Sequence, residues 1–328
     1  MKNWKSSFAG KKIGITGGLG FIGSNLAIRL CQMGASVTIY DLDDPKFGAN
    51  LYNIDPVKDD LQIIYGDLRD KQRVTEALRG CEYVFSLAGQ VSHMGSMRDP
   101  NTDLEINGEG HLNVLEACKS QMSKVVLTST RQVYGKILYL PVDERHPVQP
   151  PDVNAISKIA AEQLTKLYFD IYGLPASVLR LTNIYGPRMD IRSADKGFIS
   201  VFVRRAVTGQ AIEIFGDGEQ RRDLNHVDDL VEALFHAATN SGCYGKLFNV
   251  GHSEAVSLNQ IILGLQKSCV FPFKKIPFPE ELKKIDIGDY FTNFSAFTKE
   301  TSWKPQIDFA SGLASTIDFY KSHLPHYY

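Results

Sequence analysis

A lysine and an asparagine stand one helical turn apart in the stretch PPDVNAISKIAAEQL, residues 150–164. The apolar spacing predicts an amphipathic helix, and residues four apart share one helix face, so Asn154 and Lys158 should lie together. A lysine can exchange protons when burial lowers its pKa, whereas an amide exchanges none near neutral pH. Acid–base chemistry at this pair therefore needs a further group.

Two more side chains are candidates for the same chemistry. Thr130 ends the apolar run KVVLTST, which predicts a strand. His93 lies in the segment AGQVSHMGSMRDP after another predicted strand, and histidine exchanges protons near pH 7. A loop histidine bonded only to backbone is the alternative for His93. The candidate catalytic residues are Thr130, Asn154, Lys158 and His93.

A glycine-rich turn precedes these groups in the chain. In ITGGLGFIGSNLAIRL, Gly17, Gly20 and Gly23, with Phe21 and Ile22 among them, separate an apolar strand from an amphipathic helix. Glycine permits a tight turn and close backbone approach to a pyrophosphate, and the helix N-terminus attracts its negative charge. The pattern predicts a dinucleotide site, with an ordinary glycine-rich turn as the alternative.

The ends of the following strands complete this cofactor site. SVTIYD ends at Asp41, 18 residues after Gly23, where a carboxylate can bond both ribose hydroxyls of NAD and would repel a 2′-phosphate. In YGDLRD, Asp67 and Leu68 can frame an adenine edge. In FSLAG, Ala88 and Gly89 let the backbone pass close to the cofactor. We therefore expect NAD rather than NADP.

Short apolar runs alternate with helical patterns through the first half of the chain. This alternation predicts βαβ units, and hence an α/β fold with a doubly wound parallel Rossmann sheet. After about residue 180 the pattern is less regular, with Gly, Pro and Asp punctuation. We expect a Rossmann domain over 1–180, to which 224–250 returns, and a smaller C-terminal α/β substrate-binding lobe from 181–223 and 251–328.

Composition excludes several other classes of protein. A net charge of −1 over 328 residues provides no broad positive field for nucleic acid. The five cysteines are widely spaced without a C-x-x-C pair, so the sequence predicts neither a disulfide framework nor a metal site. No apolar run approaches the roughly 20 residues that cross a bilayer. We expect a cytoplasmic protein without a membrane or nucleic-acid partner.

With these motifs the chain resembles the extended short-chain dehydrogenase/reductase superfamily, in particular its NAD-dependent nucleotide-sugar epimerases and dehydratases. The resemblance covers nearly the whole length. Its carriers are TGGLGFIG, YGDLRD, INGEGHLNVLEAC, VVLTSTRQVYG, SKIAAE, LRLTNIYGPR, IFGDGEQRRDLNHVDD, FNVG and SWKP.

The resemblance implies that NAD takes a hydride from a sugar carbon, usually C4, while a Tyr-x-x-x-Lys pair and a nearby hydroxyl handle the proton. Thr130 matches the hydroxyl and Lys158 the lysine, which in the family also holds the nicotinamide ribose. Asn154 stands at the tyrosine position and can orient a hydroxyl but cannot replace a base. Either His93 or Lys158 itself must then carry the proton, and ribose binding alone is the alternative for Lys158.

The residues after Thr130 favour one reaction class. Family 4,6-dehydratases carry an acidic pair there, and UDP-glucuronate decarboxylases carry a glutamate nearby, whereas this chain has Arg131 and Gln132. Without those carboxylates, we rank epimerisation or sugar oxidation and reduction above dehydration. A protein that only binds NAD and a nucleotide sugar is the alternative. Arg131 either binds a phosphate or carboxylate of the substrate or is an ordinary surface arginine.

The resemblance also implies a nucleotide-sugar site and a homodimer. Asn183, Arg188 and Arg222 match or adjoin positions that contact the substrate diphosphate, and Phe215 either covers the nucleobase or packs in a core. The helices near 101–122 and 153–172 correspond to those that form a four-helix bundle across a dimer in relatives. The apolar residues that belong either to that interface or to the internal core are Leu112, Val114, Leu115 and Cys118.

Overall fold

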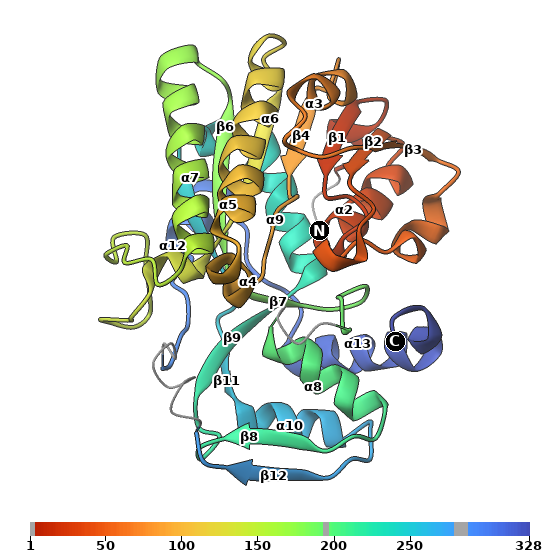
Figure 1. The fold of residues 1–328 in the computed structure, drawn as a ribbon, viewed down its shortest axis with the longest axis vertical. Coiled ribbons are helices and arrows are strands. Elements are labelled where there is room, and N and C mark those ends of the chain that lie inside the picture. The colour runs from red at the N-terminus through yellow and green to blue at the C-terminus, as the bar shows by residue number, and fades with distance from the viewer. Residues whose placement is uncertain (1–3, 193–196, 279–287) are drawn as a thin grey trace.

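A computed structural model describes residues 4–192, 197–278 and 288–328 of the chain, and its centre is a seven-stranded parallel sheet (Figure 1). The strands lie in the order β10-β6-β5-β4-β1-β2-β3. Their bounds are Lys12–Thr16 (β1), Ser36–Asp41 (β2), Leu61–Tyr65 (β3), Tyr83–Ser86 (β4), Lys124–Thr130 (β5), Ala176–Leu181 (β6) and Leu247–Val250 (β10). The order changes direction between β1 and β4, which opens a crevice at their carboxyl ends. The predicted Rossmann sheet is confirmed.

Helices cover both faces of this sheet. Neighbouring strand residues point to opposite faces, so Val126 packs in one core and Val125 in the other. The first core contains α2 (Phe21–Gln32) and α9 (Val227–Thr239). The second contains α3 (Lys71–Ala77), α6 (Gly110–Lys119) and part of α7 (Val153–Tyr172).

A smaller lobe lies below the large sheet in Figure 1. It contains two small sheets, β11-β9-β7 and β12-β8, and the helices that pack on them. The bounds are Asn183–Tyr185 (β7), Ile212–Phe215 (β8), Arg221–His226 (β9), Ala255–Ser257 (β11), Phe273–Ile276 (β12), Phe198–Val207 (α8), Leu258–Gln266 (α10) and Phe309–His323 (α13). The lobe boundaries given above remain a prediction. Within the predicted lobe segment 251–328, Phe297 of α12 (Ser295–Thr301) and Trp303 pack in a core of the large sheet.

The helix expected near 101–122 is interrupted. It comprises α5 (Pro100–Leu104), a π-helical turn over Glu105–Glu109, and α6. A π-turn shifts the side chains that follow it and often lies at functional sites. Asn107 lies in this turn.

The helix expected over 153–172 is observed with those bounds as α7. Asp152 caps its N-terminus by accepting a hydrogen bond from the Ala155 N–H at 2.8 Å. Gly173 ends it in the left-handed conformation with φ +70°. Asn154 and Lys158 therefore both lie in its first two turns. The remaining described α-helices are α1 (Lys5–Phe8) and α4 (His93–Arg98).

His111 of α6 is buried between two hydroxyl groups. Its Nδ1 lies 3.0 Å from Ser86 Oγ and its Nε2 lies 2.8 Å from Thr165 Oγ1. Burial, with a smaller contribution from the charge of Lys158, lowers the pKa of His111 to about 3. The imidazole is therefore neutral in the folded protein throughout the physiological range.

We expect the free energy of unfolding to fall as the pH falls from about 6.5 toward 3, because His111 binds a proton in the unfolded chain that the folded protein excludes. At pH 5 this one group should cost about 2 kcal/mol. Urea unfolding of the wild type and His111→Gln at pH 7, 6 and 5 measures the effect. The variant should show a flatter dependence on pH, and equal dependences would contradict the assignment.

Candidate active site

A cavity of about 540 Å³ opens at the carboxyl edge of the large sheet. Its walls come from the ends of β1, β2, β4, β5 and β6 and the segments that follow them. Its volume is in the range typical of cofactor and substrate sites. The residues predicted from sequence to bind the cofactor that line this cavity are Gly17, Gly20, Phe21, Ile22, Gly23, Asp41, Asp67, Leu68, Ala88 and Gly89.

The glycine turn leaves no room for side chains. A Cβ at Gly23 would lie 2.2 Å from the Gly17 carbonyl oxygen, and one at Gly17 would lie 2.8 Å from Ala88 Cα. Gly17 also has φ +74°, which side chains rarely adopt. The turn thus brings bare backbone and the N-terminus of α2 to the cavity, and such a cradle fits a pyrophosphate.

Asp41 is oriented by the same turn. Its Oδ2 accepts the Leu19 N–H at 2.9 Å and its Oδ1 accepts the Asp43 N–H at 3.2 Å. Burial raises the pKa of Asp41, and these backbone hydrogen bonds oppose that rise. Each carboxylate oxygen can accept a further bond from a ribose hydroxyl. A second negative charge from a 2′-phosphate would be unfavourable here, which fits NAD.

Asp67 contributes to the cavity differently from Asp41. Its carboxylate pairs with Arg69, with 2.6 Å between Oδ2 and Nη2, and the hydrogen bond from Arg69 lowers the pKa of Asp67. Tyr40 Oη donates to the Asp67 carbonyl and Asn113 Nδ2 to the Leu68 carbonyl, at 2.7 and 2.9 Å. The backbone of this strand end is therefore fixed beside the position expected for the adenine.

Two polar groups converge on Gly89. A Cβ at this position would lie 2.5 Å from Asn107 Oδ1 and 3.1 Å from Lys158 Nζ. Asn107 Nδ2 donates to the Gln90 carbonyl at 3.1 Å, whereas Asn107 Oδ1 is buried and has no hydrogen-bond partner among the described residues. A ribose hydroxyl could satisfy this acceptor. Together with the glycine cradle and Asp41, these residues fit the dinucleotide.

Lys158 is 9% exposed. Burial lowers its pKa, and the charges of Asp103 and Glu162 partly oppose that shift. Lys158 does not itself line the cavity, but a Cβ at Gly89, which does, would lie 3.1 Å from its Nζ. This position suits ribose binding, and the lowered pKa keeps proton exchange by Lys158 open.

Thr130 lines the cavity at the end of β5. It ends β5 and caps the short turn after it, and its Oγ1 accepts the Gln132 N–H at 3.2 Å. Its own O–H can therefore donate to a ligand oxygen. Arg131, Gln132 and Asn183 line the cavity beside it, and Arg131 Nη2 lies 3.4 Å from Asn183 Oδ1.

The structure does not bring the Asn154 amide to the cavity. Its side chain is buried, and its Nδ2 donates to the Gln90 carbonyl at 2.8 Å and to Asp103 Oδ2 at 3.0 Å. Ser157 Oγ donates to the other Asp103 oxygen at 2.6 Å. The hydroxyl-orienting role expected for Asn154 therefore has no support from this geometry, which instead joins α7 to α5 and the segment near 90.

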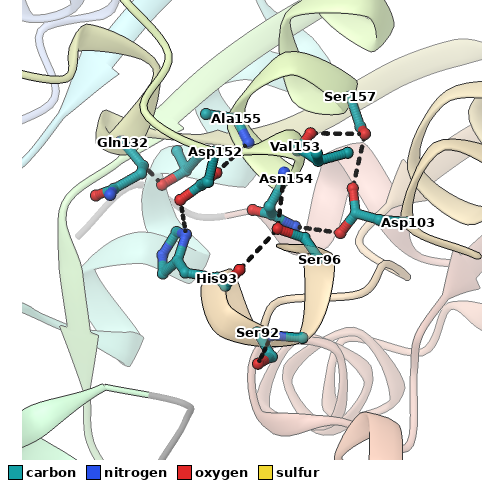
Figure 2. A network of polar contacts seen from close by, with 12 residues as sticks. Ser92, His93, Ser96, Asp103, Gln132, Asp152, Val153, Asn154, Ala155 and Ser157 are labelled. Carbon is teal, nitrogen blue, oxygen red and sulfur yellow. Dashed lines mark hydrogen bonds and ion pairs between the residues drawn. The ribbon is translucent and has the colours of Figure 1, made fainter. Parts of the chain in front are cut away.

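His93 does line the cavity. It begins the short helix α4 rather than lying in an irregular loop, and its ring bonds a side chain rather than backbone. Figure 2 shows His93 Nδ1 directed at Asp152 Oδ2, with 2.8 Å between them. The ring is 42% exposed, so a ligand in the cavity can reach it.

Three residues predicted to contact substrate do not line this cavity: Arg188, Phe215 and Arg222. Arg188 Nε donates to the Asn53 carbonyl at 3.0 Å, and its Nη1 donates to Asn25 Oδ1 at 3.1 Å. Phe215 packs on Phe278 with ring centroids 5.5 Å apart. These contacts give Arg188 and Phe215 packing roles in this structure.

Arg222 is buried in β9. Its Nη1 donates to the carbonyls of Arg221 and Gly288. Of the substrate residues predicted from sequence, Asn183 alone lines the cavity among the described residues.

Sequence reasoning missed three contributors to the site: Asp103, Asn107 as a buried acceptor, and Asp152. The sequence signal for Asp152 is limited to an acidic residue before a helix, which is typical of an N-cap. Its second contact, with a residue 59 positions earlier, depends on the tertiary fold.

We expect Gly89→Ala to weaken NAD binding at least tenfold, about 1.4 kcal/mol, because the added methyl would displace Asn107 or Lys158. Gly108→Ala is the matched control, since a Cβ there meets no heavy atom within 4 Å. Calorimetric titration with NAD, beside thermal unfolding of both variants, measures the effect. Equal NAD affinities for the two variants would contradict this view of the site.

The described residues contain neither a membrane-spanning helix nor a metal-binding group. No described helix has the length and apolar character needed to cross a membrane. Nor do the described His, Cys, Asp and Glu residues form a group able to hold a metal ion.

Comparison with known proteins gives the family. A UDP-glucose 4-epimerase of Mycolicibacterium smegmatis is 32% identical over 94% of this chain and 98% of its own length. A dTDP-glucose 4,6-dehydratase of an Actinoplanes strain is 28% identical over 95% and 98%. The crystal structure of Thermus thermophilus UDP-glucose 4-epimerase in complex with NAD covers 94% of this chain and 99% of its own at 27% identity, with a TM-score of 0.82. The profile of the NAD dependent epimerase/dehydratase family matches residues 13–251, and the chain belongs to that family.

Proposed function

We propose that the protein modifies a nucleotide-activated sugar by NAD-dependent hydride transfer, as an epimerisation or an oxidation–reduction at C4. One observation carries this proposal: a single cavity extends from the glycine turn and Asp41 to Thr130, His93 and Asn183. The cofactor residues and the proton-exchanging residues therefore face the same space. The names of the family relatives, which act on nucleotide-linked sugars, support the choice of substrate.

Each residue has a distinct role in the proposed reaction. NAD, when bound, accepts and returns the hydride. Lys158 binds the nicotinamide ribose with Asn107, and Thr130 donates a hydrogen bond to the reacting sugar oxygen. His93 exchanges the proton of that oxygen, because it lines the cavity and an imidazole nitrogen can accept and return a proton. Asn183 contacts the diphosphate.

Dehydration is disfavoured by the residues beside Thr130. An elimination needs an acid and a base at the sugar, and the two residues that follow Thr130 at the cavity wall are Arg131 and Gln132. A protein that only binds NAD and a nucleotide sugar is the second candidate. The ordered contact between His93 and Asp152 favours the enzyme, because binding alone does not require an oriented proton acceptor.

A panel of UDP-, GDP-, CDP- and dTDP-sugars tests the proposed function. We expect the purified protein with NAD to convert at least one of them to its C4 epimer or to a keto sugar, detected by NMR and mass. Lasting absorbance of reduced cofactor would indicate oxidation, and its absence with a new epimer would indicate epimerisation. No product from any sugar would favour the binding protein.

We expect His93→Asn to lower kcat by roughly 10²–10⁴-fold with little change in NAD affinity, because it removes the proton acceptor and leaves the cofactor residues intact. Lys158→Met should lower both kcat and NAD affinity, because it removes the ammonium beside Gly89. Steady-state kinetics and NAD titration of both variants separate the two roles. An unchanged kcat for His93→Asn would assign the proton to Lys158.

We further propose a homodimer formed through α5 and α7. Four apolar residues were candidates for either the dimer interface or the internal core. The structure favours the core, where Val114, Leu115 and Cys118 are buried and Leu112 packs against them. Other apolar side chains on these helices are exposed: Leu104 (44%), Ile156 (48%), Leu167 (49%) and Ile171 (66%). Burial of this apolar face in a second copy would remove it from water.

Sedimentation equilibrium tests the dimer. We expect the wild type to sediment at twice the chain mass of 36.6 kDa, and Ile171→Glu to shift toward that single-chain mass, because a charge would enter the apolar interface. Leu263→Glu is the matched control, since Leu263 is equally exposed, at 61%, but lies on α10. A monomeric wild type would contradict the proposal.

We also infer a reducing location, the cytoplasm. All five cysteines are free thiols. Burial raises the pKa of Cys81 to about 11 and that of Cys118 to about 12, which keeps both as unreactive thiols.

A further inference from the structure

The two carboxylate oxygens of Asp152 make different contacts, and the Gln132 side chain adds a further hydrogen bond to this carboxylate. Oδ1 accepts the Ala155 N–H at 2.8 Å and so caps α7. Oδ2 lies 2.8 Å from His93 Nδ1. The side chain of Asp152 is only 9% exposed, so its contact with His93 is sheltered from water.

The charge state of Asp152 fixes the tautomer of His93. Burial alone would raise the pKa of Asp152, but the hydrogen bonds from His93 and the Ala155 N–H outweigh it and leave that pKa lowered. Asp152 is therefore ionised near neutral pH and can only accept a hydrogen bond. Its partner Nδ1 must carry a proton, and in the neutral ring the lone pair is then on Nε2. No described residue forms a hydrogen bond with Nε2.

The rest of the first turn of α7 holds His93 in place. The Asn154 N–H donates to Ser96 Oγ at 3.2 Å, and Ser96 Oγ donates to the His93 carbonyl at 2.7 Å. The Asn154 side chain donates to the Gln90 carbonyl at 2.8 Å. As Figure 2 shows, Asp152 and Asn154 face the segment that carries His93, whereas Ser157 is directed at Asp103 of α5. The hydrogen bonds of Asp152 and Asn154 fix α4 on both sides of the imidazole.

We infer that Asp152 is a positioning residue that holds His93 in the tautomer able to accept a proton, and that this Asp–His pair replaces the tyrosine absent at position 154. The inference rests on the proposed function. In the oxidation step the sugar O–H bond breaks and its proton goes to His93 Nε2. The hydrogen on the same carbon leaves with its electron pair to oxidised NAD, and a carbonyl forms. The reverse step returns both to the sugar.

Asp152→Asn separates the two contacts of Asp152. Asparagine caps helices as well as aspartate does, so its Oδ1 can keep the bond from Ala155. It then presents an amide N–H to His93, which must accept on Nδ1 and carry its proton on Nε2. The variant thus keeps α7 and reverses the tautomer of His93. Asp308→Asn is the matched control, because Asp308 caps α13 by accepting the Ser311 N–H at 3.0 Å.

Nitrogen-15 NMR of the imidazole provides a readout independent of turnover. We expect the His93 resonances, assigned with His93→Asn, to report the Nδ1–H tautomer in the wild type and in Asp308→Asn. In Asp152→Asn they should report the Nε2–H tautomer. Thermal unfolding and NAD titration should match the wild type, and a tautomer unchanged by Asp152→Asn would overturn the inference.

Kinetics on a sugar that the wild type converts completes the test. We expect Asp152→Asn to lower kcat by roughly 10²–10⁴-fold with KM nearly unchanged, and Asp308→Asn to leave both unchanged. In His93→Ala, added imidazole should restore part of kcat, whereas Lys158→Met should not respond to it.

The outcomes separate this inference from the proposed function. Wild-type turnover with an unchanged kcat in Asp152→Asn would remove the positioning role and leave the function intact. Failure of imidazole to restore any kcat in His93→Ala would likewise overturn proton transfer by His93. Absence of wild-type turnover on every sugar would overturn the function, and with it this role for the pair.

Discussion

Hydrogen bonds that Asp152 accepts and Asn154 donates join the first turn of α7 to the segment 90–98, and the acid–base side of the cavity depends on this contact. Helix α7 also carries Lys158 one turn later. One rigid helix therefore sets the distance between the Lys158 ammonium and the imidazole. A site held by a helix is positioned more reproducibly than one held by loops.

Charge balance beneath the cavity supports the same arrangement. A buried ammonium is costly unless opposite charge lies nearby, and Asp103 and Glu162 supply it for Lys158. Glu162 is itself shared with Arg180, with 2.6 Å between Oε2 and Nη2. Asp103 also accepts bonds from Asn154 and Ser157. Asn154 thus stabilises the carboxylate that compensates the lysine.

The cofactor side of the site could be predicted from sequence because its signals are local. Glycine spacing determines the turn, Asp41 follows directly from a strand end, and parallel strands bring their carboxyl ends to one edge. The acid–base side of the site could not be predicted in the same way. Helix spacing gives the face on which Asn154 lies, but not its hydrogen-bond partners Asp103 and Gln90, which are 51 and 64 residues away. Nor could spacing show the contacts of Arg188, which the resemblance places near the substrate diphosphate and whose guanidinium is bonded to Asn53 and Asn25 in this structure.

The double use of Asp152 has a consequence for how sequences of relatives are read. Helix capping at this position tolerates Asp, Asn, Ser or Thr at a difference of about 1 kcal/mol or less. Orientation of an imidazole through Nδ1–H needs a second acceptor oxygen, which an asparagine lacks while its one oxygen caps the helix. A relative with Asn at this position would therefore fold normally in a folding assay. Under the proposed mechanism, its sequence would nevertheless identify a protein that lacks the proton relay.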